Sequence, residues 1–67
     1  MDIDRLRYMT QQIARNFAAL GDDQAIAATA EHIEQFWDPR MTASLLKADP
    51  AALGPVVAAV AERLKQV

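Results

Sequence analysis

The chain has 67 residues, a formal net charge of −2 and no cysteine. This length allows a single domain, over residues 1–67, which buries only about 60% of the unfolded chain's surface. The lack of cysteine excludes disulfides, thiolate-held zinc, cysteine-ligated iron–sulfur clusters and thiol catalysis, and the acidic balance argues against nucleic-acid binding.

Alanine is the most frequent of the hydrophobic residues, and aromatic residues make up only 6% of the chain. Alanine favours helix and buries little area, so we expect helices around a thin core, as in a subunit completed by a partner. The first residues lack the basic segment and apolar run of a signal peptide, and no window approaches 18 uncharged apolar residues. We therefore expect a cytoplasmic protein without a membrane partner.

The first predicted helix covers about residues 3–20. Asp2 is a suitable N-cap, and Gly21 stands where a left-handed residue often ends a helix. Between them, apolar residues recur with the helical period and predict one buried face. This stripe consists of Ile3, Leu6, Met9, Ile13, Phe17 and Leu20.

The second predicted helix covers about residues 23–37. Asp22 and Asp23 are expected to cap it and to place negative charge at its positive end. His32 is expected at the edge of its buried side, next to solvent. Because Pro39 disfavours helical geometry at the residue before it, the helix must stop near residue 36 or 37. The buried side is predicted to hold Ile26, Thr29, Ala30, Ile33, Phe36 and Trp37.

Two Asp-Pro pairs predict the next helix starts. Asp38 is expected to accept a hydrogen bond from the backbone N–H of Arg40 or Met41, with Pro39 at the first helical position. This predicts a third helix over about 39–48, whose buried edge holds Met41, Leu45 and Ala48.

Asp49-Pro50 repeats the signal and predicts a short helical turn at 50–53, ended by Gly54. Pro55 then begins a helix over about 55–66. The predicted fold is therefore all-α, a small bundle of three to four helices plus the short turn. The buried face of the last helix is expected to hold Val56, Val57, Val60, Leu64 and Val67.

The sequence offers little material for an active site. Its single histidine, His32, and single serine, Ser44, fall on different predicted helices, and no metal-binding spacing of histidine and carboxylates occurs. We therefore predict no catalytic residue, no metal ligand and no cofactor bound by this chain.

Basic residues do not predict a nucleic-acid surface. Arg5, Arg7 and Arg15 are expected to point in different directions around the first helix, as on an ordinary solvated face. A DNA-reading third helix would present only Arg40, Thr42 and Lys47 to the bases, which is too few side chains and too little positive charge. A small DNA-binding regulator thus remains the least favoured alternative.

The segment 32–41 gathers the only tryptophan, the only histidine and one of two phenylalanines at a helix–helix corner. Adjacent helical residues point about 100° apart, so Phe36 and Trp37 cannot both face the core fully. With Arg40 and Met41, an exposed Trp37 has the composition of a binding hot spot. We predict an interface made of His32, Phe36, Trp37, Arg40 and Met41.

The chain resembles the delta subunit of soluble NAD-dependent formate dehydrogenase over about residues 5–65. The specific part of the resemblance is the run from His32 through Phe36-Trp37-Asp38-Pro39-Arg40-Met41. A looser part is Arg7-Tyr8-Met9 with Gln12-Ile13-Ala14, and a leucine pair and a proline-led last helix follow later.

The resemblance implies a non-catalytic accessory subunit. Its expected partners are a large catalytic subunit with a molybdenum or tungsten pterin and iron–sulfur clusters, and subunits that carry FMN and further clusters. Its expected task is to support assembly, cofactor insertion or retention, or stability. The residues alone leave open a self-associating helical module, because a thin core often needs oligomerisation.

Overall fold

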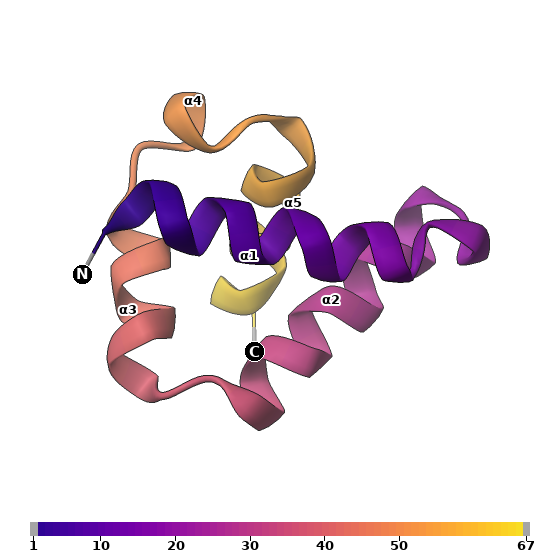
Figure 1. Ribbon diagram of the computed structural model, residues 1–67, viewed down its shortest axis with the longest axis horizontal. Coiled ribbons are helices and arrows are strands. Elements are labelled where there is room, and N and C mark those ends of the chain that lie inside the picture. Colours follow the sequence, from indigo (N-terminus) through magenta and orange to yellow (C-terminus); the bar gives the residue numbers. More distant parts are fainter. Residues whose placement is uncertain (1, 67) are drawn as a thin grey trace.

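The computed structural model describes residues 2–66, and over this range it is a helical bundle without strands (Figure 1). The predicted all-α fold is confirmed. In Figure 1 α1 crosses in front of the other helices, and it contacts α2, α3 and α5. The elements are α1 (Ile3–Asn16), the 3₁₀ turn η1 (Ala18–Leu20), α2 (Asp22–Phe36), α3 (Pro39–Lys47), α4 (Pro50–Leu53) and α5 (Pro55–Lys65).

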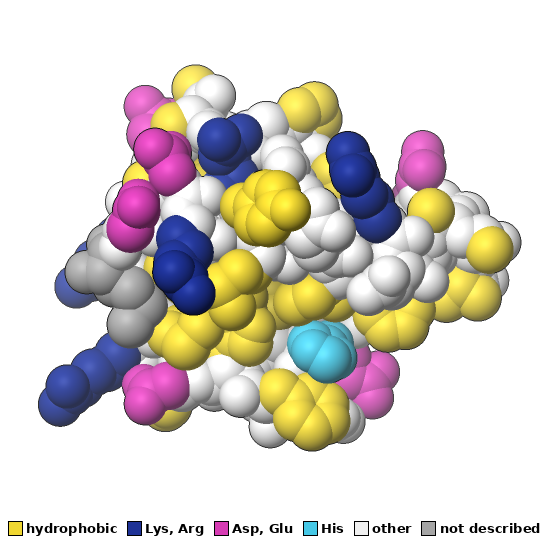
Figure 2. Space-filling view, in the orientation of Figure 1, with side chains coloured by type: hydrophobic (Ala, Val, Ile, Leu, Met, Phe, Trp, Pro, Cys, Tyr) yellow, Lys and Arg dark blue, Asp and Glu magenta, His cyan; other side chains and the backbone are white. Residues whose placement is uncertain are grey.

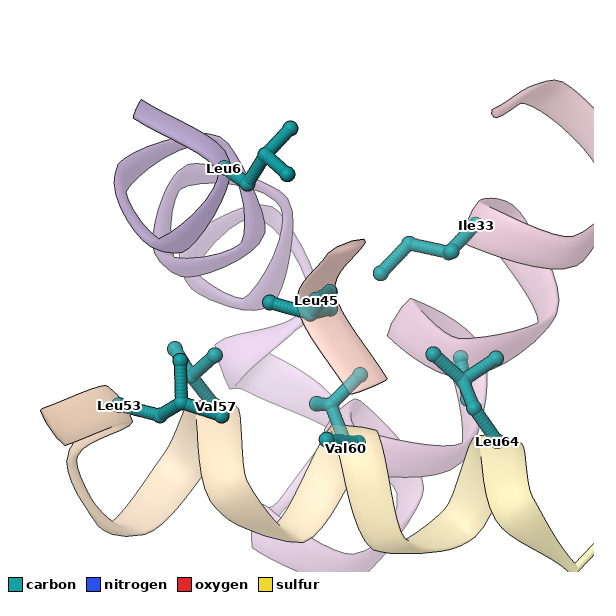
Figure 3. Close-up of a cluster of buried hydrophobic side chains, with 9 residues drawn as sticks. Leu6, Ile33, Leu45, Leu53, Val57, Val60 and Leu64 are labelled. Atoms are coloured by element: carbon teal, nitrogen blue, oxygen red, sulfur yellow. The ribbon is translucent and has the colours of Figure 1, made fainter. Parts of the chain in front are cut away.

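The core is formed by aliphatic side chains that converge from all five α-helices (Figure 3). No aromatic side chain belongs to this buried cluster in the described range, although Trp37 packs against its edge. The core is therefore thin, as the alanine-rich composition predicts. The labelled members are Leu6 of α1, Ile33 of α2, Leu45 of α3, Leu53 of α4, and Val57, Val60 and Leu64 of α5.

Two buried threonines stand on the inner faces of α1 and α2. The hydroxyl of Thr10 donates to the carbonyl oxygen of Leu6 at 2.9 Å, and that of Thr29 donates to Ala25 at 2.6 Å. Each hydroxyl is thus satisfied within its own helix and is buried without an unmade hydrogen bond.

The first helix is shorter than the predicted range 3–20. It ends at Asn16, where the N–H of Phe17 is shared between the carbonyl oxygens of Ala14 and Arg15. The chain then tightens into η1, a common way to satisfy the last carbonyls of a helix. Leu20, predicted in the buried stripe, is half exposed as a result.

The start of α2 also differs from its prediction. Its N-cap is Gly21, at φ +92°, and no side chain caps the helix there. Asp22 and Asp23 lie inside the first turn, so the predicted aspartate cap is wrong. Their charges still stand at the positive end of the helix dipole.

Both Asp-Pro starts are confirmed. Asp38 Oδ1 accepts from the backbone N–H of Arg40 at 2.7 Å, and Asp49 Oδ1 accepts from that of Ala51 at 3.0 Å. The predicted cap at Asp2 likewise accepts from Asp4 at 3.0 Å. These local signals set the helix starts within one or two residues.

The buried face of α5 is shifted relative to its prediction. Val56 is 46% exposed, and Ala61 is buried instead. At about 100° per residue, Val57, Val60, Ala61 and Leu64 fall on one side of α5, and Val56 lies outside that side. The predicted burial of Val67 falls outside the described residues. Among residues 2–66, no helix has the length and apolar character needed to cross a membrane.

Candidate docking site at the α2–α3 corner

A two-residue connection joins α2 to α3. Trp37 leaves the helix with φ −84° and ψ 144°, while its N–H still donates to the carbonyl oxygen of Ile33 at 2.9 Å. Asp38 is also extended, as a residue before proline prefers. Pro39 then starts α3 with the Asp38 carboxylate as cap, so the corner has a defined backbone.

Phe36 is the exposed aromatic residue of the corner, and Trp37 is not. Phe36 exposes 70% of its surface, whereas Trp37 is half-buried and packs against the core. The sequence predicted that one of the pair stands outside, but the expectation that it was Trp37 is wrong. Trp37 turns inward because its backbone has left the helix, while Phe36 remains helical on the edge of α2 that the core does not cover.

His32 holds the exposed ring of Phe36. The two ring centroids are 4.8 Å apart at an interplanar angle of 39°. The residues are one helical turn apart, so α2 itself aligns them. His32 is half-buried, as its predicted edge position requires. Figure 2 shows the histidine in cyan among hydrophobic side chains on the surface.

Arg40 and Met41 complete the corner from the first turn of α3. The side chain of Arg40 is exposed, and Met41 is half-buried against the core. Of the five predicted interface residues, two therefore project into solvent and three support them. All five come from the end of α2, the connection and the first turn of α3, and Phe36 and Arg40 are the exposed ones.

The described residues show no constellation for catalysis or metal binding. Among residues 2–66, no group of three or more histidine, aspartate or glutamate side chains is placed to hold a metal ion. His32 lies on α2 and Ser44 on α3. What the corner offers chemically is an aromatic and cationic contact surface.

The sequence reasoning missed an open groove at the other end of α2. Its volume is about 550 Å³, and its walls come from α1, η1, α2 and the α4–α5 turn. Segments this far apart in sequence share no local pattern, so no signal in the sequence indicates this groove. We call it the glycine-end groove; it is lined by Gln11, Ala14, Arg15, Ala18, Asp22, Ala25, Ile26, Leu53, Gly54, Pro55 and Val56.

Comparisons with known proteins give one match. Residues 5–61 match the family described as NADH-dependent formate dehydrogenase delta subunit FdsD. Searches of curated proteins and of solved structures found no match. The matched range begins within α1, contains α2, α3, α4 and the corner, and ends within α5. The chain belongs to the family of delta subunits of NADH-dependent formate dehydrogenase.

Proposed function

We propose that this chain is a non-catalytic accessory subunit that docks on the large catalytic subunit of NAD-dependent formate dehydrogenase. In this proposal it supports assembly of the enzyme, insertion or retention of the cofactor, or stability of the large subunit. The partners carry the chemistry: a molybdenum or tungsten pterin, iron–sulfur clusters and FMN. The complex works in the cytoplasm.

The exposure of Phe36 is the observation that carries the proposal. A phenylalanine that exposes 70% of its surface leaves a large apolar area in water. Its ring already packs against His32. Phe36 would therefore lose little side-chain freedom when a pocket of the partner receives it. An ordered aromatic anchor of this kind is typical of binding hot spots.

Arg40 supplies the polar part of the proposed contact. It stands in the first turn of α3, whose backbone is fixed by the hydrogen bond from its own N–H to Asp38. Its guanidinium is suited to pair with a carboxylate or with backbone carbonyls of the partner. Trp37 and Met41 pack beneath the corner on the core and hold the anchors in place.

Co-purification of the catalytic subunit with the tagged full chain tests the proposal. We expect Phe36→Ala and Arg40→Ala to reduce the recovered catalytic subunit and the formate-dependent reduction of NAD. Leu20→Ala is the matched control, because it removes a half-exposed apolar side chain from η1, which precedes the opposite end of α2. If both corner variants keep full recovery and activity, the corner is not the docking site.

A further inference from the structure

The outward face of α1 carries a second set of contact residues. Arg5, Tyr8, Gln12 and Arg15 follow one another at steps of three, four and three residues, which places them on one side of a helix. Tyr8 exposes 60% of its surface, and Arg5 and Arg15 are both exposed. This α1 face, defined by these four residues, looks away from the core.

The three arginines of α1 therefore do not form the uniformly solvated surface that the sequence predicts. Arg7 does point elsewhere: it is half-buried, and its buried Nε has no hydrogen-bond partner among the described residues. Arg5 and Arg15 instead lie on the same side of α1 as Tyr8. In Figure 2 dark-blue side chains stand on either side of a hydrophobic side chain on the face that α1 covers.

The charge of α1 contrasts with that of the rest of the chain. The helix holds three arginines against one aspartate, although the whole chain has a net charge of −2. In α2 there are four carboxylates and no lysine or arginine. Two of the three arginines lie on the α1 face, which is thus a positive surface on an acidic protein and complements a negatively charged partner.

The corner alone is too small for a stable interface. Specific interfaces bury about 800 Å² on each partner, roughly a sixth of the chain's 4505 Å² of accessible surface. Five side chains, three of them half-buried, fall short of that area. Figure 2 shows the histidine of the corner and the surface of α1 on the same side of the molecule. The surface of α1 is therefore open to a partner that binds the corner from this side.

We propose that an acidic, carboxylate-bearing surface of the same catalytic subunit docks on the α1 face. This inference rests on the proposed function. The two arginines stand ten residues apart, about 15 Å along the helix, and pair with carboxylates at each end, while Tyr8 packs between them. Arginine and tyrosine are both enriched among the residues that dominate protein interfaces.

A nucleic acid fits this face less well than an acidic protein surface. The positive stripe is short, and carboxylates bound it at both ends. Asp4 precedes Arg5, and Asp22 lines the glycine-end groove together with Arg15. A continuous polyanion would meet both carboxylates, whereas a compact acidic surface of a protein avoids them.

A second copy of this chain also offers an acidic helix, α2. Pairing α1 of one copy with α2 of another joins two different surfaces, which builds open chains unless the rotation happens to close. Binding to the catalytic subunit forms a single contact and builds no such chains. We therefore assign the α1 face to the catalytic subunit.

Association kinetics with the purified catalytic subunit test the inference. The double variant Arg5→Glu, Arg15→Glu should slow association of the full chain at least about tenfold at about 50 mM salt, and the difference should shrink at about 300 mM. The matched control is Arg63→Glu, Lys65→Glu, which changes the net charge equally on exposed positions of α5. It should slow association less than about twofold. Tyr8→Ala should act mainly by raising the dissociation rate.

The outcomes separate the two proposals. If the wild-type chain binds the catalytic subunit and the double variant associates equally fast, the α1 inference is wrong and the docking proposal stands. If the wild-type chain does not bind, the docking proposal fails and this inference fails with it. Light scattering and binding to a short DNA duplex complete the test. A wild-type dimer or a DNA complex that the double variant loses would assign the face to that occupant and overturn the inference.

Discussion

The start of α2 is surrounded by small side chains, and its end carries large aromatic ones. At its start, the small side chains of Ala14, Ala18 and Ala25 line the glycine-end groove, which lies open between four segments. At its end, Phe36 projects into solvent and Trp37 fills the edge of the core. One helix thus has the glycine-end groove at its start and the exposed ring of Phe36 at its end, about 21 Å away by the rise of its 15 residues.

The helix starts at the two ends of α2 also depend on different chemistry. Gly21 relies on backbone freedom, because φ +92° is strained for any other residue. The corner relies on side-chain chemistry, because Asp38 caps α3 and Pro39 presets its first turn. A glycine start leaves space beside it, whereas an aspartate–proline start fixes the direction of the side chains that follow. An aspartate–proline start therefore suits a binding surface whose side chains must point in one direction.

Replacement of Ile33 should affect both ends of α2 at once and have the largest effect. Ile33, in the last turn of α2, is fully buried in the core on which the whole helix packs, so Ile33→Ala should lower the free energy of unfolding by about 2–5 kcal/mol. A chain of this length has about 3–10 kcal/mol in total, so the variant should be partly unfolded. Urea unfolding followed by circular dichroism measures the change. Retention of wild-type stability would contradict the assigned core.

Replacement of Gly21 should disturb the groove end alone. An added Cβ meets no atom within 4 Å, so the cost of Gly21→Ala comes from the backbone at φ +92°. Non-glycine residues in this region cost about 1–3 kcal/mol, and thermal unfolding should show it. Gly54→Ala, at φ +82°, should cost a similar amount. If neither variant is destabilised, the two positive-φ helix starts do not exist in solution.

Replacement of Asp38 should disturb the corner end alone. Asp38→Ala removes the hydrogen bond to the N–H of Arg40 and should cost about 1 kcal/mol of stability. Asp38→Asn keeps an oxygen acceptor and should remain close to wild type. Chemical denaturation of the two variants in parallel gives the difference. Equal losses would mean that the carboxylate acts through its charge and not as a cap.

Replacement of Phe36 should have the smallest effect on folding. Because the side chain is 70% exposed, Phe36→Ala should change the free energy of unfolding by less than about 0.5 kcal/mol. Trp37→Ala removes a half-buried side chain that packs on the core and should cost at least about 1.5 kcal/mol. The same unfolding experiment ranks the two. A larger loss for Phe36 would reverse the assignment of inner and outer aromatic residue.

The sequence by itself determined where most helices begin, because those signals act over two or three residues. Asp2, Asp38 and Asp49 each accept from a backbone N–H two positions on, and no distant segment is needed for that bond. Membership of the delta-subunit family could also be predicted, from the run of residues at the corner. The five residues of the predicted interface come from one stretch of the chain, the end of α2, the connection and the first turn of α3, and their role as an interface stays a prediction.

Tertiary packing decided what the local signals could not. Phe36 and Trp37 are both large and apolar, and only the path of the chain after α2 determines which one the core receives. Leu20 and Val56 fit helical patterns in sequence, yet no neighbouring helix covers either fully. Burial depends on what lies opposite a side chain, and that partner comes from a distant part of the sequence. For the same reason the glycine-end groove emerged only once the helices were placed.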